Sequence, residues 1–364
     1  MTQPCTTPIT IVGAGPVGLL LACLLGQQGT AVHLYEKRRG LPNASMAIGI
    51  TPPSLDFLAT LDLKTPFLRR GVRIPRAQVY EQQHRCGILD FRGTENEILS
   101  LPQHGTLDLL RQRLYDFPSI TFLEGTPWDP DATDTHTGWL IACDGAHSPI
   151  RKHLRIPLKQ KTYPATFIMA DFPDTETLGP DARLYFSPRG AVESFPLPDH
   201  RRRWIAQCVQ APATLHTLQQ RVLDAANIDL RNRDHSTPYP FTPQRTLAKT
   251  YHQKNIILCG DAAHTMSPIG GQGMNTGFAD AWHLSRILPN PTPAALTAYT
   301  KARQCAFRVA ARRAAMGMYL GTRTGIPASR IREKILRAAL QQPRTHHTLA
   351  KTFAMRNLPD PHVP

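Results

Sequence analysis

The stretch that decides the fold lies near the N-terminus and reads Ile9-Thr-Ile-Val-Gly-Ala-Gly-Pro-Val-Gly18. A short β-rich run precedes the glycines, and a helix-forming run follows over residues 19–28, ended by Gly29. Strand character returns at residues 31–35, directly before the acidic Glu36. This order predicts a βαβ unit with its glycines in the turn between the first strand and the helix.

The three glycines of this turn, Gly13, Gly15 and Gly18, meet the requirements of a bound dinucleotide. Such a ligand needs a tight strand-to-helix turn, bare backbone near its pyrophosphate, and a helix N-terminus whose free N–H groups favour negative charge. Glu36 stands at the end of the second strand, where a carboxylate can accept both hydroxyls of the adenosine ribose. The segment therefore predicts dinucleotide binding, but it does not distinguish FAD from NAD(P).

Length and composition are those of a folded protein with two or three domains, since the chain has 364 residues, of which 41% are hydrophobic and 19% charged. The formal net charge of +15 attracts nucleic acid, acidic lipid and phosphorylated cofactors alike. Residues 301–345 carry eleven Lys and Arg residues and a single acidic residue, Glu333. We expect a solvated helical face there, or contact with an anionic membrane surface or an acidic substrate. Nucleic-acid binding is not expected, because no recognised nucleic-acid module accompanies the charge.

Several kinds of site are not indicated. The seven cysteines are scattered and never form a C-x-x-C pair, which argues against a zinc ribbon or a disulfide framework and favours a reducing, cytoplasmic compartment. The sequence shows no metal-site spacing, Walker A loop or G-x-S-x-G elbow, so we expect no metal and a chemistry supplied by a cofactor. No apolar run approaches the ~20 residues that span a bilayer, so any membrane contact would be peripheral.

Two later motifs also place a carboxylate after a short apolar strand. The first reads Trp139-Leu-Ile-Ala-Cys-Asp-Gly-Ala-His-Ser-Pro-Ile-Arg151. The second reads Asn255-Ile-Ile-Leu-Cys-Gly-Asp-Ala-Ala-His264 and continues into a glycine-rich stretch that ends at Asn275. Between them, residues 162–243 alternate in short runs that predict an antiparallel sheet, and after Pro293 the pattern becomes helical.

These three motifs, in this order, resemble the GxGxxG, DG and GD fingerprints of the class A FAD-dependent monooxygenases, the para-hydroxybenzoate hydroxylase-like aromatic hydroxylases. The stretch from Arg183 to Pro198, which ends Ser-Phe-Pro-Leu-Pro, also resembles the strands of that family's substrate sheet. The resemblance implies an α/β fold in which a Rossmann-like FAD-binding domain is interleaved with an antiparallel β-sheet substrate domain and followed by a C-terminal helical segment. We expect the FAD-binding domain at residues 1–75, 101–165 and 245–292, the substrate domain at 76–100 and 166–244, and the helical segment at 293–364.

The same resemblance implies roles for individual residues in binding the cofactor. Glu36 would hold the adenosine ribose, and Asp261 and Gln103 would hold the ribityl chain. Pro268 would line the isoalloxazine beside its reactive C4a. The DG-motif residues expected near the pyrophosphate, and during engagement of NAD(P)H, are Asp144 and Arg151.

The GD block is expected to position the flavin itself. Its loop could aim backbone N–H groups at the N1–C2=O edge of the ring, where charge develops on reduction. Pro268 and Gly273 are the residues expected to position the flavin for catalysis, and no obligatory acid or base is identified. The remaining GD-block residues expected at the cofactor are Gly260, Gly271, Met274 and Asn275.

One position departs from the family pattern. Met46 stands where relatives usually carry an arginine that contacts the cofactor, and a thioether cannot pair with phosphate. Lys37 and its basic neighbours Arg38 and Arg39 either offset the missing charge or form a solvated surface. Two interpretations are open for Tyr185, Phe186, Phe195 and Pro196 of the predicted sheet: an apolar wall for a planar substrate, or plain core packing.

The resemblance implies an FAD-dependent, NAD(P)H-consuming monooxygenase that hydroxylates an aromatic or related electron-rich small molecule through a flavin C4a-hydroperoxide. There is no second glycine-rich βαβ unit, so NADPH or NADH would bind only transiently. The expected partners are a small aromatic substrate and O2, in a monomer or a homodimer. Two alternatives stay open: an FAD-dependent reductase or dehydrogenase of the same fold, and a non-catalytic dinucleotide-binding protein, which Met46 favours.

Overall fold

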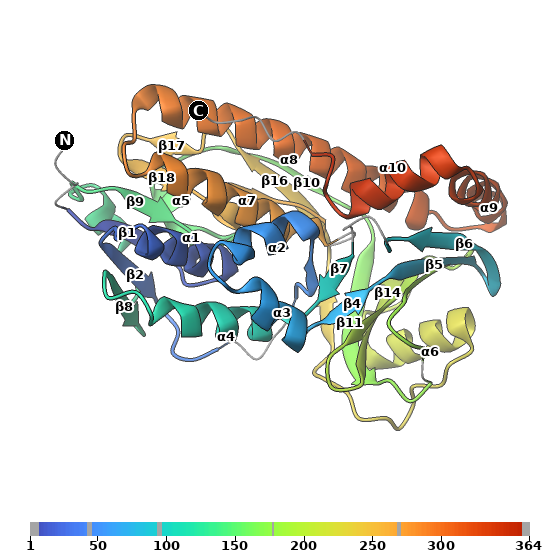
Figure 1. Ribbon diagram of the computed structural model, residues 1–364. Helices are drawn as coiled ribbons and strands as arrows, with labels where there is room; N and C mark the ends of the chain where they lie inside the picture. The colour runs from blue at the N-terminus through green and yellow to red at the C-terminus, as the bar shows by residue number, and fades with distance from the viewer. Residues whose placement is uncertain (1–6, 42–45, 93–96, 177, 268–270, 359–364) are drawn as a thin grey trace.

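The computed structural model describes residues 7–41, 46–92, 97–176, 178–267 and 271–358. Two large sheets lie in different parts of the molecule, and one long helix, α8 (Pro293–Gly321), runs along the top of the view in Figure 1.

The first sheet has six strands in the order β17-β18-β9-β1-β2-β8. Neighbouring strands are parallel, except that β17 pairs antiparallel with β18. The strands β1, β9 and β18 are buried along their whole length, as expected for a parallel sheet that is covered on both faces. The strand bounds are β1 (Ile9–Val12), β2 (Val32–Glu36), β8 (Ile120–Glu124), β9 (Leu140–Ala142), β17 (His252–Gln253) and β18 (Ile256–Leu258).

The helix α1 (Pro16–Gln27) follows β1 and contacts both α4 (Gln103–Leu114) and α7 (Gln272–Ile287). Residues 18–26 of α1 are all buried, which explains why this helix is apolar on every side. It begins three residues earlier than the run 19–28 predicts, because Pro16 occupies the first helical position, where the missing N–H and fixed φ of proline are tolerated.

The second sheet has seven strands in the order β15-β11-β14-β13-β12-β5-β6. The pairing is antiparallel, as predicted, except between β12 and β5, which are parallel. One face packs against α6 (Leu215–Ala226) in a core that contains Phe172 and Trp204. The strand bounds are β5 (Arg76–Glu81), β6 (His84–Asp90), β11 (Thr166–Pro173), β12 (Ala182–Phe186), β13 (Val192–Leu197), β14 (Arg201–Cys208) and β15 (Tyr239–Phe241).

Two three-stranded sheets and several short elements complete the core of the fold. The small sheets have the orders β3-β7-β4 and β10-β16-β19. Their strands are β3 (Gly49–Ile50), β4 (Val72–Ile74), β7 (Ile98–Ser100), β10 (Leu158–Thr162), β16 (Gln244–Ala248) and β19 (His264–Thr265). The short helices are α2 (Pro52–Ala59), α3 (Lys64–Arg70) and α5 (Pro149–His153), with single 3-10 turns η1 (Pro130–Thr133) and η2 (Gly260–Ala262).

The C-terminal part is helical, as predicted, and consists of α8, α9 (Ile326–Gln341) and α10 (Pro343–Phe353). The helix α9 contacts β5 and β6, while α10 contacts β6 and α9, so these helices cover the end of the second sheet (Figure 1). The combination of a parallel sheet with helices, a mainly antiparallel sheet and a helical C-terminal segment confirms the predicted fold class.

Candidate active site

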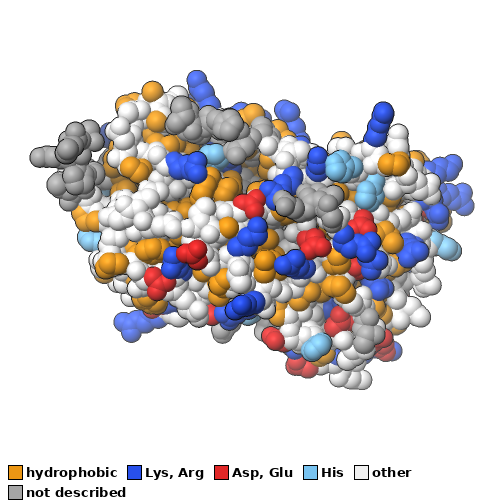
Figure 2. Space-filling model, in the orientation of Figure 1, with side chains coloured by type: hydrophobic (Ala, Val, Ile, Leu, Met, Phe, Trp, Pro, Cys, Tyr) orange, Lys and Arg blue, Asp and Glu red, His pale blue; other side chains and the backbone are white. Residues whose placement is uncertain are grey.

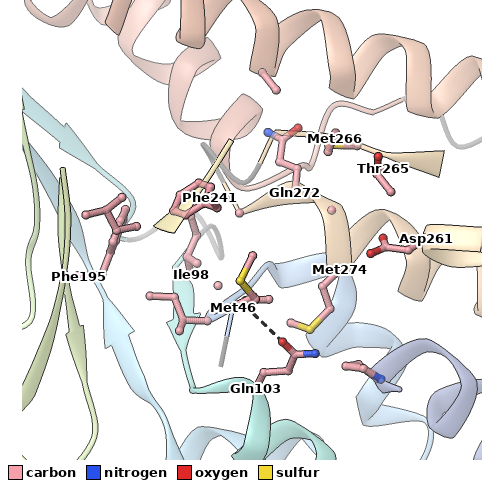
Figure 3. A pocket seen from close by; sticks show the side chains of 18 of the residues that line it. Met46, Ile98, Gln103, Phe195, Phe241, Asp261, Thr265, Met266, Gln272 and Met274 are labelled. Carbon is pink, nitrogen blue, oxygen red and sulfur yellow. Dashed lines mark hydrogen bonds between the residues drawn. The ribbon is translucent and has the colours of Figure 1, made fainter. Parts of the chain in front are cut away.

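A cavity of about 1000 Å³ extends from the glycine turn of the first sheet to the open face of the second sheet. Its wall also includes residues of α8, α9 and α10. Figure 3 shows side chains from separate elements converging on it, among them Gln103 of α4, Phe195 of β13, Asp261 of η2 and Met274 of α7. The cavity therefore joins the predicted cofactor site to the predicted substrate sheet.

Two of the three glycines in the turn have no room for a side chain, whereas the third has. Gly13 has a φ of +103°, and a Cβ there would lie 2.4 Å from the carbonyl oxygen of Cys143. A Cβ on Gly18 would lie 1.9 Å from the carbonyl oxygen of Gly13, whereas one on Gly15 would meet nothing within 4 Å. Gly13 and Gly15 line the cavity, and Gly18 lies behind them. The uncapped N-terminus of α1 at Gly15 thus leaves backbone N–H groups available at the cavity wall.

Glu36 lies at the end of β2 on the cavity wall, as its predicted role requires. Its carboxylate accepts hydrogen bonds from the backbone N–H of Ala14 at 2.9 Å and of Arg38 at 3.0 Å. The Arg38 guanidinium also pairs with it at 3.2 Å. Lys37 lines the same part of the cavity. The carboxylate therefore ties the end of β2 to the glycine turn.

The DG motif places one of its two predicted residues in the cavity. Asp144 lines the wall, and its Oδ2 accepts a hydrogen bond from the N–H of Ile150, while its buried Oδ1 has no partner in the described structure. Burial raises the pKa of this carboxyl. Arg151 is buried away from the cavity and donates hydrogen bonds to the carbonyl oxygens of Ala262 and Ala146. It therefore joins the DG segment to the GD segment.

The GD motif follows β18, and its Asp261 is exposed to the cavity. The protein that surrounds this carboxyl raises its pKa, whereas His264 acts to lower it. Gly260 lies off the cavity wall, and a Cβ there would meet the side chain of Val17 at 3.1 Å. The motif thus presents one carboxylate to the cavity and packs its glycine against α1.

A buried ionic network that sequence reasoning missed holds the GD segment. Asp280 of α7 accepts hydrogen bonds from His264 Nε2 at 2.6 Å and from Arg303 Nε of α8 at 2.7 Å. It also accepts one from the N–H of Gly260 at 3.3 Å. Burial opposes ionisation of Asp280, but His264 and Arg303 hold its pKa below the usual value. The network links η2, α7 and α8.

The N-terminus of α7 supplies several cavity residues. Gly271, Gly273 and Met274 line the wall as expected, and so does Gln272, whose buried Oε1 has no partner in the described part of the chain. Asn275 does not line it. Pro268 lies outside the described residues.

The side chain of Asn275 instead fixes the backbone next to the cavity. It donates hydrogen bonds to the carbonyl oxygens of Gly49 and Gly271 and accepts one from the N–H of Thr51. Gln103, at the start of α4, lines the cavity and accepts a hydrogen bond from the N–H of Ala47 at 3.4 Å (Figure 3).

These groups fit FAD. Asp144 Oδ1 and Gln272 Oε1 are buried acceptors without partners on or beside the wall, and the free N–H groups of α1 face the same space. Buried polar atoms in native proteins are nearly always hydrogen-bonded, so these atoms indicate a polar ligand. Glu36, Asp261 and the α1 N-terminus would then hold the ribose, the ribityl chain and the pyrophosphate, respectively.

The part of the cavity next to the second sheet is mainly apolar. Phe186 and Phe195 line it, as expected for an apolar wall. Tyr185 instead packs on the opposite face of the sheet, stacked on Tyr80 and Trp204, because successive residues of a strand face opposite sides. Pro196 is also absent from the wall. Other apolar residues there are Ala77, Val79, Leu89, Phe91, Met169, Leu184, Ile205 and Phe241.

Two charged residues of the second sheet also face this part of the cavity, and sequence reasoning missed both. Arg203 of β14 pairs with Asp171 at 2.6 Å and donates a hydrogen bond to the carbonyl oxygen of Met46 at 2.9 Å. Glu193 of β13 is buried, has no polar partner among the described residues, and has its pKa raised by burial to about 7. The alternation of β13 signals that Glu193 shares a face with Phe195, but not which face lines a cavity.

Within the described residues, no group of three or more His, Cys, Asp and Glu residues could hold a metal ion. None of the described helices is long and apolar enough to cross a membrane.

A family model described as "FAD binding domain" matches residues 6–313 of the chain. The chain is 28% identical over 313 residues to a 3-(3-hydroxy-phenyl)propionate/3-hydroxycinnamic acid hydroxylase of Klebsiella pneumoniae, a match that covers 77% of this chain and 55% of that protein. It is 26% identical over 323 residues to the kynurenine 3-monooxygenase of Anopheles gambiae, covering 77% and 66%. A p-nitrophenol 4-monooxygenase from Pseudomonas putida has a similar structure, with a TM-score of 0.84 at 19% identity over 95% of this chain and 98% of that chain.

The structural similarity shows a shared fold. In sequence, the chain spans 55% of the length of the Klebsiella hydroxylase. The family match covers most of the chain and includes all three motifs on which the prediction rested. The chain therefore belongs to the FAD-binding family of the class A flavin-dependent monooxygenases, and its cofactor is FAD.

Proposed function

We propose that the protein is a monooxygenase that uses FAD, NAD(P)H and O2 to hydroxylate an aromatic or similarly electron-rich small molecule. The observation that carries this proposal is the single cavity, which runs from the glycine turn and Asp261 to the apolar wall around Phe195. A planar substrate on that wall would share one continuous cavity with the flavin. The names of the relatives, a hydroxylase of hydroxyphenylpropionate and a kynurenine 3-monooxygenase, support an aromatic substrate.

Bound FAD supplies the redox chemistry that activates O2, and the protein's own residues must position the reactants and exclude water. Apolar side chains of β12, β13 and β14 face the substrate part of the cavity, which favours a dry environment for oxygen transfer. The backbone N–H groups at the start of α7 border the cavity and would stabilise negative charge on a reduced ring bound next to them. Arg203 donates a hydrogen bond to the carbonyl oxygen of Met46 and so holds this backbone in the cavity wall.

We include NADPH or NADH as a reductant that binds transiently. Support comes from the sequence, in which only one glycine-rich βαβ unit occurs, and that unit faces the cavity where FAD fits. The reductant would then reach the flavin from outside this site and leave after hydride transfer.

The test is isotope incorporation from ¹⁸O2. Purified FAD-loaded protein is supplied with NADPH or NADH and a panel of phenols and anilines, and the products are analysed by mass spectrometry. We expect substrate-dependent consumption of reduced nicotinamide and one ¹⁸O atom per hydroxylated product. A product oxidised without ¹⁸O would favour the dehydrogenase alternative, and protein that binds no FAD would favour the non-catalytic one.

A further inference from the structure

Glu193 is an unusual residue for its place in the fold. It is the second residue of β13 and lies on the cavity-facing side, and its neighbours across the two adjacent strands are Leu184 of β12 and Ile205 of β14. The next residue along β13 on the same face is Phe195, which is also apolar. A carboxyl group is thus set into an otherwise apolar surface, with only 8% of the residue exposed.

The arginines that line the cavity near the second sheet are either paired with other groups or exposed to solvent. Arg203 of β14 pairs with Asp171. Arg332 of α9 forms a buried ion pair with Glu81 of β5 at 2.7 Å. The two lining arginines of α8 differ: Arg313 donates hydrogen bonds to Asn357, and Arg312 is exposed.

Glu193 therefore has no hydrogen-bond or ionic partner within the described residues, although it is buried. Leaving a buried carboxyl unpaired costs free energy, and an apolar residue at this position would avoid the cost. Unpaired polar groups that line a cavity are typical of ligand-binding sites. The partner of Glu193 is expected to be a molecule that enters the cavity.

We propose that Glu193 is a substrate-binding residue that accepts a hydrogen bond from a hydroxyl or amino group on the aromatic ring of the substrate. The inference rests on the proposed function and narrows its substrate class. A ring substituent that donates a hydrogen bond satisfies the carboxylate, whereas a substrate carboxylate at this position would be repelled by it. The apolar neighbours Leu184, Ile205 and Phe195 would contact the ring itself.

The test measures binding, without turnover, through the change that a ligand produces in the flavin absorbance of the FAD-loaded protein. The probes are 2-naphthol, its methyl ether 2-methoxynaphthalene, and 2-naphthoate. We expect the native protein to bind 2-naphthol about 10- to 100-fold more tightly than the ether, the range of a hydrogen bond to a charged acceptor. Glu193→Gln should remove most of this preference, leave the affinity for the ether unchanged, and strengthen binding of 2-naphthoate.

The control variant is Glu176→Gln, which removes the same charge from an exposed ion pair with Arg233 outside the cavity. It should keep the native preference. In the native protein, 2-naphthol affinity should also rise as the pH is raised through about 7, where Glu193 ionises, while affinity for the ether stays constant. If Glu193→Gln does not fold, the pH dependence of 2-naphthol affinity in the native protein still tests the inference.

Native protein that shows no preference for 2-naphthol over its ether, or a Glu193→Gln variant that retains the preference, overturns the inference. Incorporation of ¹⁸O in that case would leave the proposed function intact. A clear Glu193-dependent preference without any ¹⁸O in the products would instead support the binding role and contradict the monooxygenase activity.

Discussion

At the scale of single residues, the glycines of the first turn have separable roles. Gly18→Ala would place a Cβ 1.9 Å from the carbonyl oxygen of Gly13, so the turn must shift. We expect this variant to lose about 2 kcal/mol or more in free energy of unfolding, the usual effect of overpacking, and to purify with little FAD. Thermal unfolding and the flavin content of the purified protein check this.

Gly15→Ala is the matched comparison. Its Cβ would meet no protein atom within 4 Å, and the φ of −71° at this position suits alanine. Without FAD, the variant should therefore have the native Tm, but its methyl group would point into the cavity where the pyrophosphate fits. We expect FAD affinity, measured by fluorescence titration, to fall about tenfold, which corresponds to about 1.4 kcal/mol. Equal loss of stability in both variants would contradict the separation of roles.

The raised pKa of Glu193 also predicts how stability depends on pH. Burial raises this pKa from 4.5 to about 7, so the folded protein binds more protons than the unfolded chain between these values. Ionisation of Glu193 therefore lowers the free energy of unfolding increasingly as the pH rises from about 4 to 8. Relative to Glu193→Gln, the native protein should lose about 2 to 3 kcal/mol over this range, as measured by urea denaturation. A stability difference that does not change with pH would show that Glu193 is not buried as described.

The residues of the site that could be predicted from the sequence belong to continuous motifs. Glu36 is the last residue of a strand, and Gly13 and Asp261 come shortly after strands, so local order along the chain is enough to place them. Glu193 and Arg203 could not be predicted, because their position depends on which face of a distant sheet borders the cavity. A single sequence does not contain that information.

At the scale of elements, the buried network around Asp280 determines how η2, α7 and α8 fit together. Asp280→Asn would leave Arg303 buried without its charge partner. We expect a loss of about 3 to 5 kcal/mol in free energy of unfolding, together with weaker FAD binding, because η2 carries Asp261. Chemical denaturation and FAD titration are the measurements. Asp229→Asn, which breaks the exposed pair with Arg231, should change neither quantity, since such pairs contribute little.

The elements themselves were predictable where local pattern controls them. The first βαβ unit follows from glycine spacing and apolar runs, and the C-terminal helices follow from their periodicity. The parallel pairing of β12 with β5 could not be predicted, because it joins segments about 100 residues apart and depends on tertiary packing. The same holds for β7, which pairs with β3 and β4 instead of joining the second sheet.

At the scale of the whole molecule, part of the excess positive charge lies next to an exposed apolar face of α9. Ile331 and Ile335 are one turn apart and are 61% and 43% exposed, with the exposed Lys334 beside them. Figure 2 shows Lys and Arg side chains gathered at the end of the molecule where α9 lies. Apolar side chains flanked by basic ones favour an anionic membrane surface, where each Lys or Arg contributes about 1 kcal/mol.

The opposite face of α9 lines the proposed substrate part of the cavity. Leu336 and Leu340 line the cavity from inside, while Ile331 and Ile335 point outward. One helix thus separates the apolar part of the cavity from the surface that carries the isoleucines. Binding of that surface to lipid would bring an apolar substrate dissolved in the membrane next to the cavity wall.

We therefore expect the protein to sediment with vesicles that contain phosphatidylglycerol and to remain in solution with pure phosphatidylcholine vesicles. Raising NaCl to about 0.5 M should release most of it, because salt screens exposed charges. The double variant Ile331→Gln and Ile335→Gln should bind the anionic vesicles more weakly at every salt concentration. Tyr115→Gln, which removes a 68% exposed apolar residue beyond α4, should bind as the native protein does. If the double variant also binds as the native protein does, the attraction comes from net charge alone, and α9 has no special part in it.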